Sequence, residues 1–481
     1  MADTTGPFST ATEMLAALDA RTISSVELTQ LHLDRIDALD GPLNAIPVRT
    51  TERALESAKR ADAARAAGKQ GALLGIPMTL KESTQAAGLP QSAGLMPFKD
   101  HRPVNDGPIA RSVFGAGACL LGTTNIPVAL GDWQADSPVY GRTNNPWDLT
   151  RTPGGSTGGG AAALAAGLTP LEIGSDIGGS IRVPAAYCGV YGHRPSETAV
   201  PRAGSFPLAE LPNPAAVMGV QGPLARSAVD LELLFDVVAG PVVGEDAGWR
   251  LALPPARAER LADLRVAIMP ALSIAQPSEE MRHKVEELAS YLGACGAAVG
   301  EAMPVVDQRA YLHDYLMLLM AITTQGLSRE VREAAAERSR ASGDPMRLAE
   351  AEGLTMDAVA FLKLLNRREV ARSAWRTFFL DWDVLVCPTA LDAAFPHQVG
   401  EMNARLLTID GHDVPYMTNI IYPMWAIFAG QPATAFPAGL GSGGLPMGLQ
   451  AIGPYLEDRT TLRFAQLLER EWHCFQPPPG Y

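Results

Sequence analysis

The sequence predicts an α/β protein with a mixed central β-sheet covered by helices on both faces. Short apolar segments typical of strands alternate with longer segments in which apolar residues recur at helical spacing. Two glycine-rich turns that carry serine follow the strand-like segments, and strand ends are where α/β enzymes present reactive groups. Of the 481 residues, 47% are hydrophobic and 19% are charged, which is enough apolar material for a large core.

The N-terminal segment, residues 10–67, is predicted to be helical. Ser24 and Glu27 have the spacing of a capping box, in which each side chain accepts from the other residue's backbone N–H. Apolar residues follow at helical spacing, and an alanine- and charge-rich segment over residues 51–67 predicts a second helix.

Strand-like segments then lead to the candidate site residues. Residues 71–80 predict a short strand with Lys81 at its end, and residues 122–125 and 171–173 predict two further strands. After a link rich in proline, alanine and glycine, the second half continues the alternation. Its predicted strands lie at 264–269, from 299 onward, at 383–387 and in the tail at 436–453, and its predicted helices lie at 278–292, 311–324, 348–375 and 458–472.

Residues 150–191 are the segment around which the chain is organised. One glycine-rich turn carries Ser156 and a second carries Ser180, with an alanine-rich segment of high helix propensity between them. Glycine permits positive φ and a close approach of the backbone to a ligand. Such turns around a helix of small residues can place two hydroxyls on one pocket floor, and the N–H groups of the second turn suit a developing oxyanion.

Three motifs carry a resemblance to a known family: GIPMTLKE around Lys81, PGGSTGGG around Ser156 and GSDIGGSIRVPA around Ser180. Lys81 precedes Ser156 by 75 residues, and Ser180 follows Ser156 by 24. In this order and at these separations the motifs resemble the amidase signature family of serine hydrolases. The resemblance extends from about residue 25 to about residue 470.

The resemblance implies a hydrolase that cleaves an amide C–N bond through an acyl-enzyme. It implies that Ser180 attacks the carbonyl, and that Ser156, which follows a cis peptide, relays the proton to Lys81 as base and then acid. A lysine base must be neutral, so burial would have to lower its pKa from about 10.4. The expected oxyanion hole consists of the backbone N–H groups of Ile177, Gly178, Gly179 and Ser180.

The sequence departs from the common pattern of the family in several places. Thr157 stands where serine is usual, and Gly160 stands where serine or another polar residue is usual. Ile177 and Val183 replace polar residues of the glutamine-using subunits. These two changes make the pocket mouth more apolar and predict a small apolar or aromatic amide of the aryl acylamide type, with carbamates and esters as further substrates.

Alternative functions stay open at this point. One is the glutamine-hydrolysing A-type subunit of a tRNA-dependent amidotransferase, which would work with partner subunits. Another is an inactive binding relative, although the intact Lys81, Ser156 and Ser180 argue against it. His193 lies near Ser180 in the sequence, but the chain has no GxSxG motif that would indicate a Ser-His-Asp hydrolase.

A substrate pocket is expected around three further residues. Trp133 and Gln134 precede the first serine turn and could line the acyl pocket together with Thr157. A packed tryptophan explains Trp133 equally well. Tyr311 and Tyr315 could belong to a substrate cap, but their helical spacing favours the core of a helix.

The chain is expected to form one domain over residues 1–481. Its catalytic core is placed at roughly 25–240 by the three motifs. The segment at roughly 300–430 resembles the family least and is expected to be a variable substrate-cap region inserted in the same domain.

The net charge and the cysteine and histidine content indicate which partners and cofactors to expect. The net charge of −13 argues against nucleic acid and anionic membranes as partners. Five scattered cysteines and eight histidines show no disulfide framework and no metal-ligand spacing, so we expect no metal and no cofactor. Neither a signal-peptide pattern nor a bilayer-spanning apolar stretch is evident. We expect a cytoplasmic monomer or homodimer that acts on a small-molecule amide.

Overall fold

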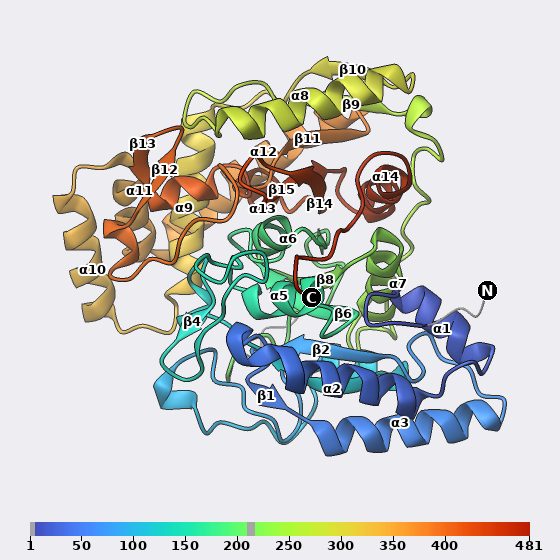
Figure 1. Cartoon of the computed structure of the whole chain (residues 1–481). Coiled ribbons are helices and arrows are strands. Elements are labelled where there is room, and N and C mark those ends of the chain that lie inside the picture. Colours follow the sequence, from blue (N-terminus) through green and yellow to red (C-terminus); the bar gives the residue numbers. More distant parts are fainter. Residues whose placement is uncertain (1–4, 209–216) are drawn as a thin grey trace.

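The computed structural model describes residues 5–208 and 217–481 (Figure 1). Within these residues one eleven-stranded sheet runs through the molecule in the order β1-β3-β2-β6-β8-β7-β14-β15-β11-β9-β10. The sheet is mixed, because β2 is parallel to β3 and β6 whereas β6 and β8 are antiparallel. The predicted α/β class with a mixed central sheet is confirmed.

The strands of the large sheet are β1 Val48–Arg49, β2 Pro77–Lys81, β3 Cys119–Thr124, β6 Leu171–Asp176, β7 Tyr191–Arg194, β8 Val220–Ala225, β9 Arg265–Ile268, β10 Ala298–Glu301, β11 Val384–Pro388, β14 Ala433–Leu440 and β15 Pro446–Ile452. Small hairpins are formed by β4 Asp136–Ser137 with β5 Gly141–Arg142, and by β12 Leu406–Ile409 with β13 His412–Pro415.

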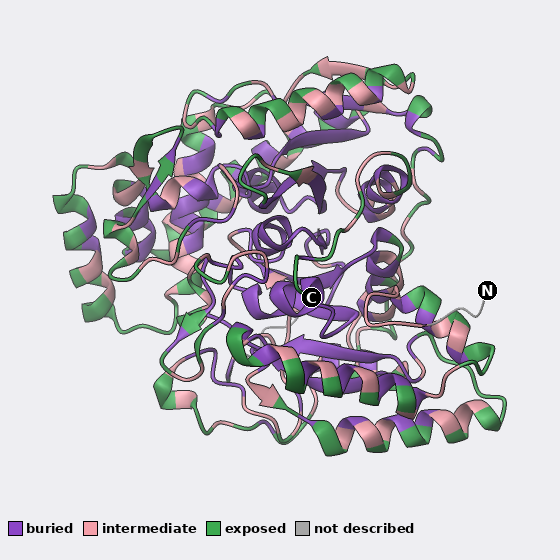
Figure 2. Cartoon of the chain, in the orientation of Figure 1, coloured by how far each residue is buried: buried purple, intermediate pink, exposed green. Residues whose placement is uncertain are grey.

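The helices are α1 Ala11–Asp19, α2 Ser25–Leu43, α3 Thr51–Ala66, α4 Pro108–Gly115, α5 Gly158–Ala165, α6 Arg182–Cys188, α7 Ala228–Val238, α8 Glu279–Ala294, α9 Gln308–Thr323, α10 Arg329–Ala341, α11 Pro345–Leu354, α12 Ala358–Asp381, α13 Met424–Ala429 and α14 Asp458–Glu471. The outer sides of α2 and α3 are exposed, whereas α5, α6 and the strands beside them are almost wholly buried (Figure 2).

The two faces of the sheet have different roles near the site. Leu80 of β2 and Ile173 of β6 point into a core that also contains residues of α4, α7 and α14. Because successive side chains of a strand point to opposite faces, Lys81 and Glu172 lie on the other face. That face is covered by α5, which packs on β2, β3, β6 and β8. The alternation therefore places the polar residues of β2 and β6 under one short helix.

Several local predictions are confirmed, one is wrong, and one helix was not predicted. The Ser24–Glu27 capping box is present, and Lys81 ends its strand, although β2 is shorter than the predicted residues 71–80. The single helix predicted over 348–375 is wrong. It is α11 and α12, because the Asp357 carboxylate accepts from Ala360 N–H at 2.7 Å and begins a new helix. None of the predicted helices covers α10.

The segment 300–430 contains α9 to α13 and also β11, which is a strand of the large sheet, whereas α9, α10 and α11 lie to one side of that sheet (Figure 1). Tyr311 of α9 donates to the carbonyl of Trp425 at 2.8 Å, and Arg368 of α12 forms a buried ion pair with Glu197. The first contact joins α9 and α13 within the segment, and the second ties the segment to Glu197, which follows β7 of the large sheet.

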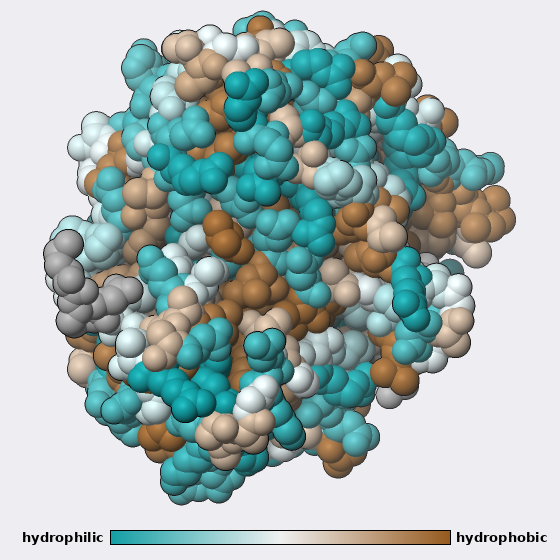
Figure 3. Space-filling model, turned by 90° about the vertical axis from the view of Figure 1, so that its right-hand side faces the viewer, coloured by the Kyte–Doolittle hydropathy of each residue, from teal (hydrophilic) through white to brown (hydrophobic). Residues whose placement is uncertain are grey.

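The surface is largely polar on the face that carries α7 and α14, where apolar atoms gather near the middle (Figure 3). Along residues 5–208 and 217–481, no helix combines the length and the apolar character needed to cross a bilayer.

Candidate active site

A buried amine surrounded by hydroxyls lies at the end of β2. Among the described residues, Lys81 Nζ lies 2.7 Å from Ser156 Oγ, 2.9 Å from Thr157 Oγ1 and 3.0 Å from Ser175 Oγ. An ammonium has three donors and no acceptor, so the three hydroxyls match its capacity. Ser156 and Thr157 come from the first serine turn and Ser175 from the end of β6, so the amine joins both predicted turns.

Burial dominates the charge state of Lys81. It lowers the pKa of the Lys81 amine to about 7, although Glu172 and Asp176 act to raise it. The cause is the loss of water around the charged form. The amine therefore exchanges its proton near neutral pH, as a general base needs to do.

The first serine turn requires glycine. The Gly155–Ser156 peptide is cis, and Gly154 has a φ of +83°. A Cβ on Gly155 would lie 2.4 Å from the carbonyl oxygen of Asp132. Because glycine has no side chain, the turn packs directly against the backbone at Asp132, and the side chain of Ser156 lies next to Lys81.

The second serine turn lies directly against the first. Thr157 N–H donates to the carbonyl of Ser180 at 3.2 Å. Ser180 retains 7% of its exposure, whereas Ser156 and Lys81 retain only 1%, so Ser180 is the member of this set that a ligand reaches first. Its Oγ makes no hydrogen bond with any residue in the described part of the chain.

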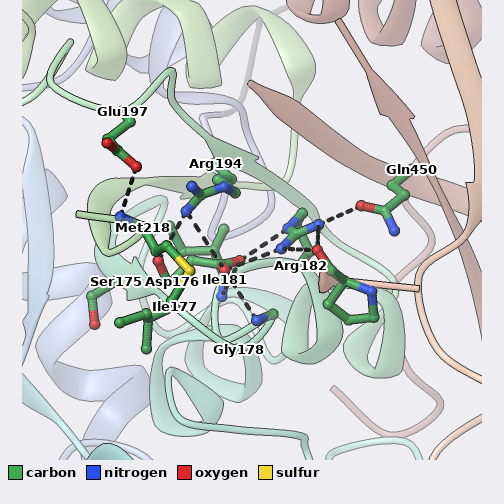
Figure 4. A network of polar contacts seen from close by, with 12 residues as sticks. Ser175, Asp176, Ile177, Gly178, Ile181, Arg182, Arg194, Glu197, Met218 and Gln450 are labelled. Atoms are coloured by element: carbon green, nitrogen blue, oxygen red, sulfur yellow. Dashed lines mark hydrogen bonds and ion pairs between the residues drawn. The ribbon is translucent and has the colours of Figure 1, made fainter. Parts of the chain in front are cut away.

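A buried carboxylate holds the second turn in shape (Figure 4). Asp176 accepts from Gly179 N–H at 3.0 Å and from Arg182 Nε at 3.0 Å, while Arg194 donates to the Asp176 carbonyl at 3.0 Å. Burial alone would raise the pKa of Asp176, but Arg182 and Arg194 lower it below its ordinary value. The carboxylate stays ionised and fixes the turn from beneath.

Two aromatic donors orient the peptide groups of the same turn. Tyr315 OH donates to the Ile177 carbonyl at 2.9 Å, and Trp133 Nε1 donates to the Gly178 carbonyl at 2.9 Å. In a planar trans peptide the N–H points away from the C=O. Each hydrogen bond to a carbonyl therefore also fixes the direction of the N–H of the next residue. The bond to the Ile177 carbonyl fixes the N–H of Gly178.

One of the four backbone N–H groups expected to form the oxyanion hole already has an acceptor within the chain. The N–H groups of Ile177, Gly178 and Ser180 have no acceptor among the residues with described positions, whereas the N–H of Gly179 is used by Asp176. The arrangement can therefore offer backbone donors beside Ser180 Oγ. A hydroxyl, a proton acceptor and backbone donors together suit acyl transfer.

A family model described as Amidase matches residues 27–462. The chain belongs to the amidase signature family. It is 33% identical to the A-type subunit of the glutamyl-tRNA(Gln) amidotransferase of Chromohalobacter salexigens, over 98% of each chain. It is 31% identical to an acylamidase of Rhodococcus erythropolis, over 97% of this chain and 96% of the relative.

A solved structure shows the same fold. The crystal structure of a bacterial aryl acylamidase of the amidase signature family superposes with a TM-score of 0.81 at 24% identity, over 98% of this chain and 99% of the other. The resemblance stated from the three motifs is thus confirmed by the family match, and this amidase is a hydrolase of amide bonds.

Two residues predicted to line the pocket, Trp133 and Gln134, use their polar atoms in hydrogen bonds to other residues of the amidase. The Trp133 indole N–H is engaged by Gly178, and both amide atoms of Gln134 bond to the backbone of Gln398, at 2.8 and 3.0 Å. Only the ring of Trp133 remains for apolar contact, and it packs against Tyr416. Thr157 is buried, and its hydroxyl lies 2.9 Å from Lys81 Nζ.

The ring nitrogens of His193 are engaged by Thr434 at 2.9 Å and by Asp458 at 3.2 Å. The structure therefore gives His193 buried partners other than the serines. Ser175 and Glu172 were not among the predicted site residues, and the helical spacing of Tyr315 favoured helix core over a substrate cap. Ser175 lies within the second glycine-rich turn, which was the available signal for it.

Proposed function

We propose that this amidase hydrolyses small amides with an apolar or aromatic group, of the aryl acylamide type. The supporting observation is the largely apolar packing around Ile177 and Gly178. A Cβ placed on Gly178 would lie 3.5 Å from Ile420 Cδ1 and 3.9 Å from Tyr315 OH. Ile177 is half-buried and packs against the cluster that contains Ile420 and Trp133. A group bound over this turn would therefore meet mainly carbon atoms.

In the proposed mechanism, Ser180 Oγ attacks the amide carbonyl. Its proton passes to Ser156 as the Ser156 proton passes to neutral Lys81. The backbone N–H groups of Ile177, Gly178 and Ser180 stabilise the oxyanion. The lysine proton returns through Ser156 to the leaving nitrogen, the C–N bond breaks, and an acyl-Ser180 ester remains. Water then attacks this ester by the same proton route and releases the acid.

The charges around the site support a neutral substrate. Asp176, Arg182 and Arg194 are buried, and Asp176 forms ion pairs with Arg182 at 3.0 Å and with Arg194 at 3.9 Å. Arg405 pairs with Asp132 at 2.6 Å beside Trp133. Carbamates and esters present the same carbonyl to Ser180 and are proposed as further substrates.

The alternative function is glutamine hydrolysis as an A-type subunit within an amidotransferase. One observation favours it. The relative from Chromohalobacter salexigens is an amidotransferase subunit of this type and matches along 98% of the chain.

We further propose that substrate choice depends on residues 300–430, as a cap within a single domain over residues 1–481 whose catalytic core is roughly 25–240. Both Tyr315 and Ile420, which border Gly178, belong to this segment. Specificity follows the shape and polarity of the pocket wall. Exchange of Ile420 for a polar residue is therefore expected to change the ranking of substrates.

A substrate panel tests the proposal. The panel is p-nitroacetanilide, butyramide, L-glutamine, a phenyl carbamate and p-nitrophenyl acetate, with wild type, Ser180→Ala and Lys81→Ala. Turnover of the anilide or carbamate, lost in both variants, supports the proposed function. Turnover of glutamine alone would establish the alternative. Hydrolysis that survives in Ser180→Ala would contradict the mechanism.

A further inference from the structure

The dipeptide Asp132-Trp133 lies between the two serine turns. The carbonyl oxygen of Asp132 packs against Gly155 of the first turn, where a Cβ would lie only 2.4 Å away. The indole N–H of Trp133 donates to the Gly178 carbonyl of the second turn at 2.9 Å. The Trp133 carbonyl accepts from Thr152 Oγ1, also at 2.9 Å. This dipeptide therefore contacts both turns, although it contributes no group to the proposed proton route.

Trp133 and Asp176 hold the two ends of one peptide group in the second turn. Trp133 bonds the carbonyl of Gly178, and the Asp176 carboxylate accepts from the N–H of Gly179 at 3.0 Å. This carbonyl and this N–H belong to the same planar peptide, so the two hydrogen bonds together fix its orientation. The next peptide carries the N–H of Ser180, which is one of the expected oxyanion donors. Loss of the indole bond would leave the peptide before it held from one side only.

Tyr416 contacts both residues of the dipeptide from the segment 300–430, which we call the cap segment. Its side chain is buried. The Tyr416 hydroxyl donates to the Asp132 carboxylate at 2.6 Å, and its ring packs on the Trp133 ring with 5.4 Å between the ring centroids. The side chain of Trp133 therefore has one contact with the cap segment and another with the oxyanion turn.

Two further interactions bind the cap segment at the same place. Arg405 forms an ion pair with Asp132 at 2.6 Å. Gln134, the residue after the dipeptide, exchanges two hydrogen bonds with the backbone of Gln398, at 2.8 and 3.0 Å. The dipeptide and its neighbour are thus joined to the cap segment by hydrogen bonds, an ion pair and ring packing.

The backbone that leads into Asp132 is strained. Ala129 and Leu130 have φ values of +52° and +60°, in the left-handed region that residues with a side chain seldom adopt. Such conformations are costly, persist only where surrounding contacts impose them, and cluster at functional sites. The contacts of Asp132 and Trp133 thus hold this part of the chain against its local preference.

We propose that Asp132 and Tyr416 are positioning residues that couple the cap segment to the oxyanion turn through Trp133. The inference rests on the proposed role of Ser180 as nucleophile. The Asp132 carboxylate and the Tyr416 ring keep the indole N–H on the Gly178 carbonyl. The backbone donors beside Ser180 then keep the direction that a developing oxyanion needs. Neither positioning residue touches the substrate in this role, so both act on the rate of acylation through the backbone.

The test is a double-mutant cycle on the reaction of Ser180 with a fluorophosphonate probe. Ser180 Oγ displaces fluoride from phosphorus, and the phosphoryl oxygen takes the place of the oxyanion, so the natural substrate need not be known. The variants are Trp133→Phe, which removes the indole N–H but keeps a ring, Asp132→Ala, and the two combined. Each single variant is expected to lose about tenfold in the maximal rate of labelling, less than for loss of a direct oxyanion donor. The combined variant should lose no more, because Asp132 acts through the indole bond.

The probe concentration that gives half of the maximal labelling rate should stay at the wild-type value in all three variants. Tyr416→Phe removes only the hydroxyl and keeps a ring on Trp133, so it should lower the maximal rate by less than Asp132→Ala does. Asp132→Asn keeps an acceptor for Tyr416 and should recover part of the loss. These two variants carry the test if Asp132→Ala fails to fold. Thr408→Ala is the matched control within the cap segment, because its hydroxyl bonds Asp413 at 2.9 Å, and it should label as the wild type does.

Losses that multiply in the combined variant, or a wild-type maximal rate in folded Asp132→Ala and in Tyr416→Phe, would overturn the coupling and leave the proposed function intact. A change confined to the half-maximal probe concentration would also overturn it. Absence of labelling at Ser180 in the wild type, or full labelling in Lys81→Ala, would instead overturn the proposed function and the inference that depends on it.

Discussion

Lys81 Nζ and Ser156 Oγ lie 2.7 Å apart although 75 residues separate them in the chain. The contact depends on the parallel pairing of β2 with β6, which brings the end of one strand under the turn that precedes the other. It links a group that titrates near neutral pH to the hydroxyl of Ser156, whose neighbour Thr157 donates its N–H to the Ser180 carbonyl. The predictions below follow from this pair and from the residues that hold it.

Lys81→Ala and Ser156→Ala are each expected to lower kcat/KM by about 10²–10⁴-fold, since each removes one step of the proton route. The measurement is steady-state hydrolysis of p-nitroacetanilide. Lys363→Ala, which changes an exposed lysine of α12, is the matched control and should behave as the wild type. Comparable activity in Lys81→Ala and Lys363→Ala would show that Lys81 is not the base.

The pH dependence follows from the lowered pKa of Lys81, which is about 7. The neutral amine is the active form, so kcat/KM should rise tenfold per pH unit below about pH 7 and level off above it. In Lys81→Ala the residual activity should lack this acidic limb. A profile that falls as the pH rises through neutrality would contradict a lysine base.

Tyr315→Phe tests whether the hydroxyl on the Ile177 carbonyl orients the oxyanion hole. Removing it frees one peptide group of the turn, and kcat is expected to fall about tenfold with little change in KM, less than for loss of a direct oxyanion donor. Tyr311→Phe is the control. Tyr311 lies on the same helix as Tyr315, and its hydroxyl also donates to a backbone carbonyl, that of Trp425. Equal effects of the two substitutions would indicate only a loss of packing.

Asp176→Asn should destabilise the fold strongly. It leaves Arg182 and Arg194 buried without their carboxylate, and breaking a buried pair in this way costs about 3–5 kcal/mol. Denaturant unfolding followed by circular dichroism gives the free energy of unfolding. Glu369→Gln removes half of an exposed pair with Arg376 and should have a much smaller effect.

Gly179→Ala should abolish most activity. Gly179 has a φ of +90°, and a Cβ there would lie 2.9 Å from Pro423 and from Val183 Cγ2. A shift of the turn by a fraction of an ångström misplaces Ser180, and about a 10²-fold loss of kcat is expected. Gly343→Ala is the control, since it has a φ of +68° and open space around it. It should lower stability slightly and leave kcat unchanged.

Local patterns predicted the elements well where one signal dominated. The Ser24–Glu27 capping box and the strand before Lys81 are both present. The pattern failed at residues 348–375, where helical spacing of apolar residues continues across the break. The cap at Asp357 ends that continuity, and aspartate also occurs within helices, so its position in the sequence alone did not indicate a boundary.

The candidate site was predicted only as far as the three sequence motifs reach. Ser156 and Ser180 stand in turns whose glycines are visible in the sequence. Tyr315 and Glu172 carry no such signal, because a tyrosine in an apolar helix and a glutamate in a strand are ordinary residues until their neighbours are known. Tyr315 meets Ile177 across 138 positions of the chain.

The sequence by itself determined the α/β class, the family and the order of Lys81, Ser156 and Ser180, because these depend on local propensity and on motifs of adjacent residues. Only the tertiary structure decided which side chains surround Lys81, which N–H group beside Ser180 is used by Asp176, and that Glu172 lies against Gly160. The reason is physical: burial, register and hydrogen bonding arise from the pairing of β2, β3 and β6 and the packing of α5 on them. Such contacts between distant segments are set by the whole fold.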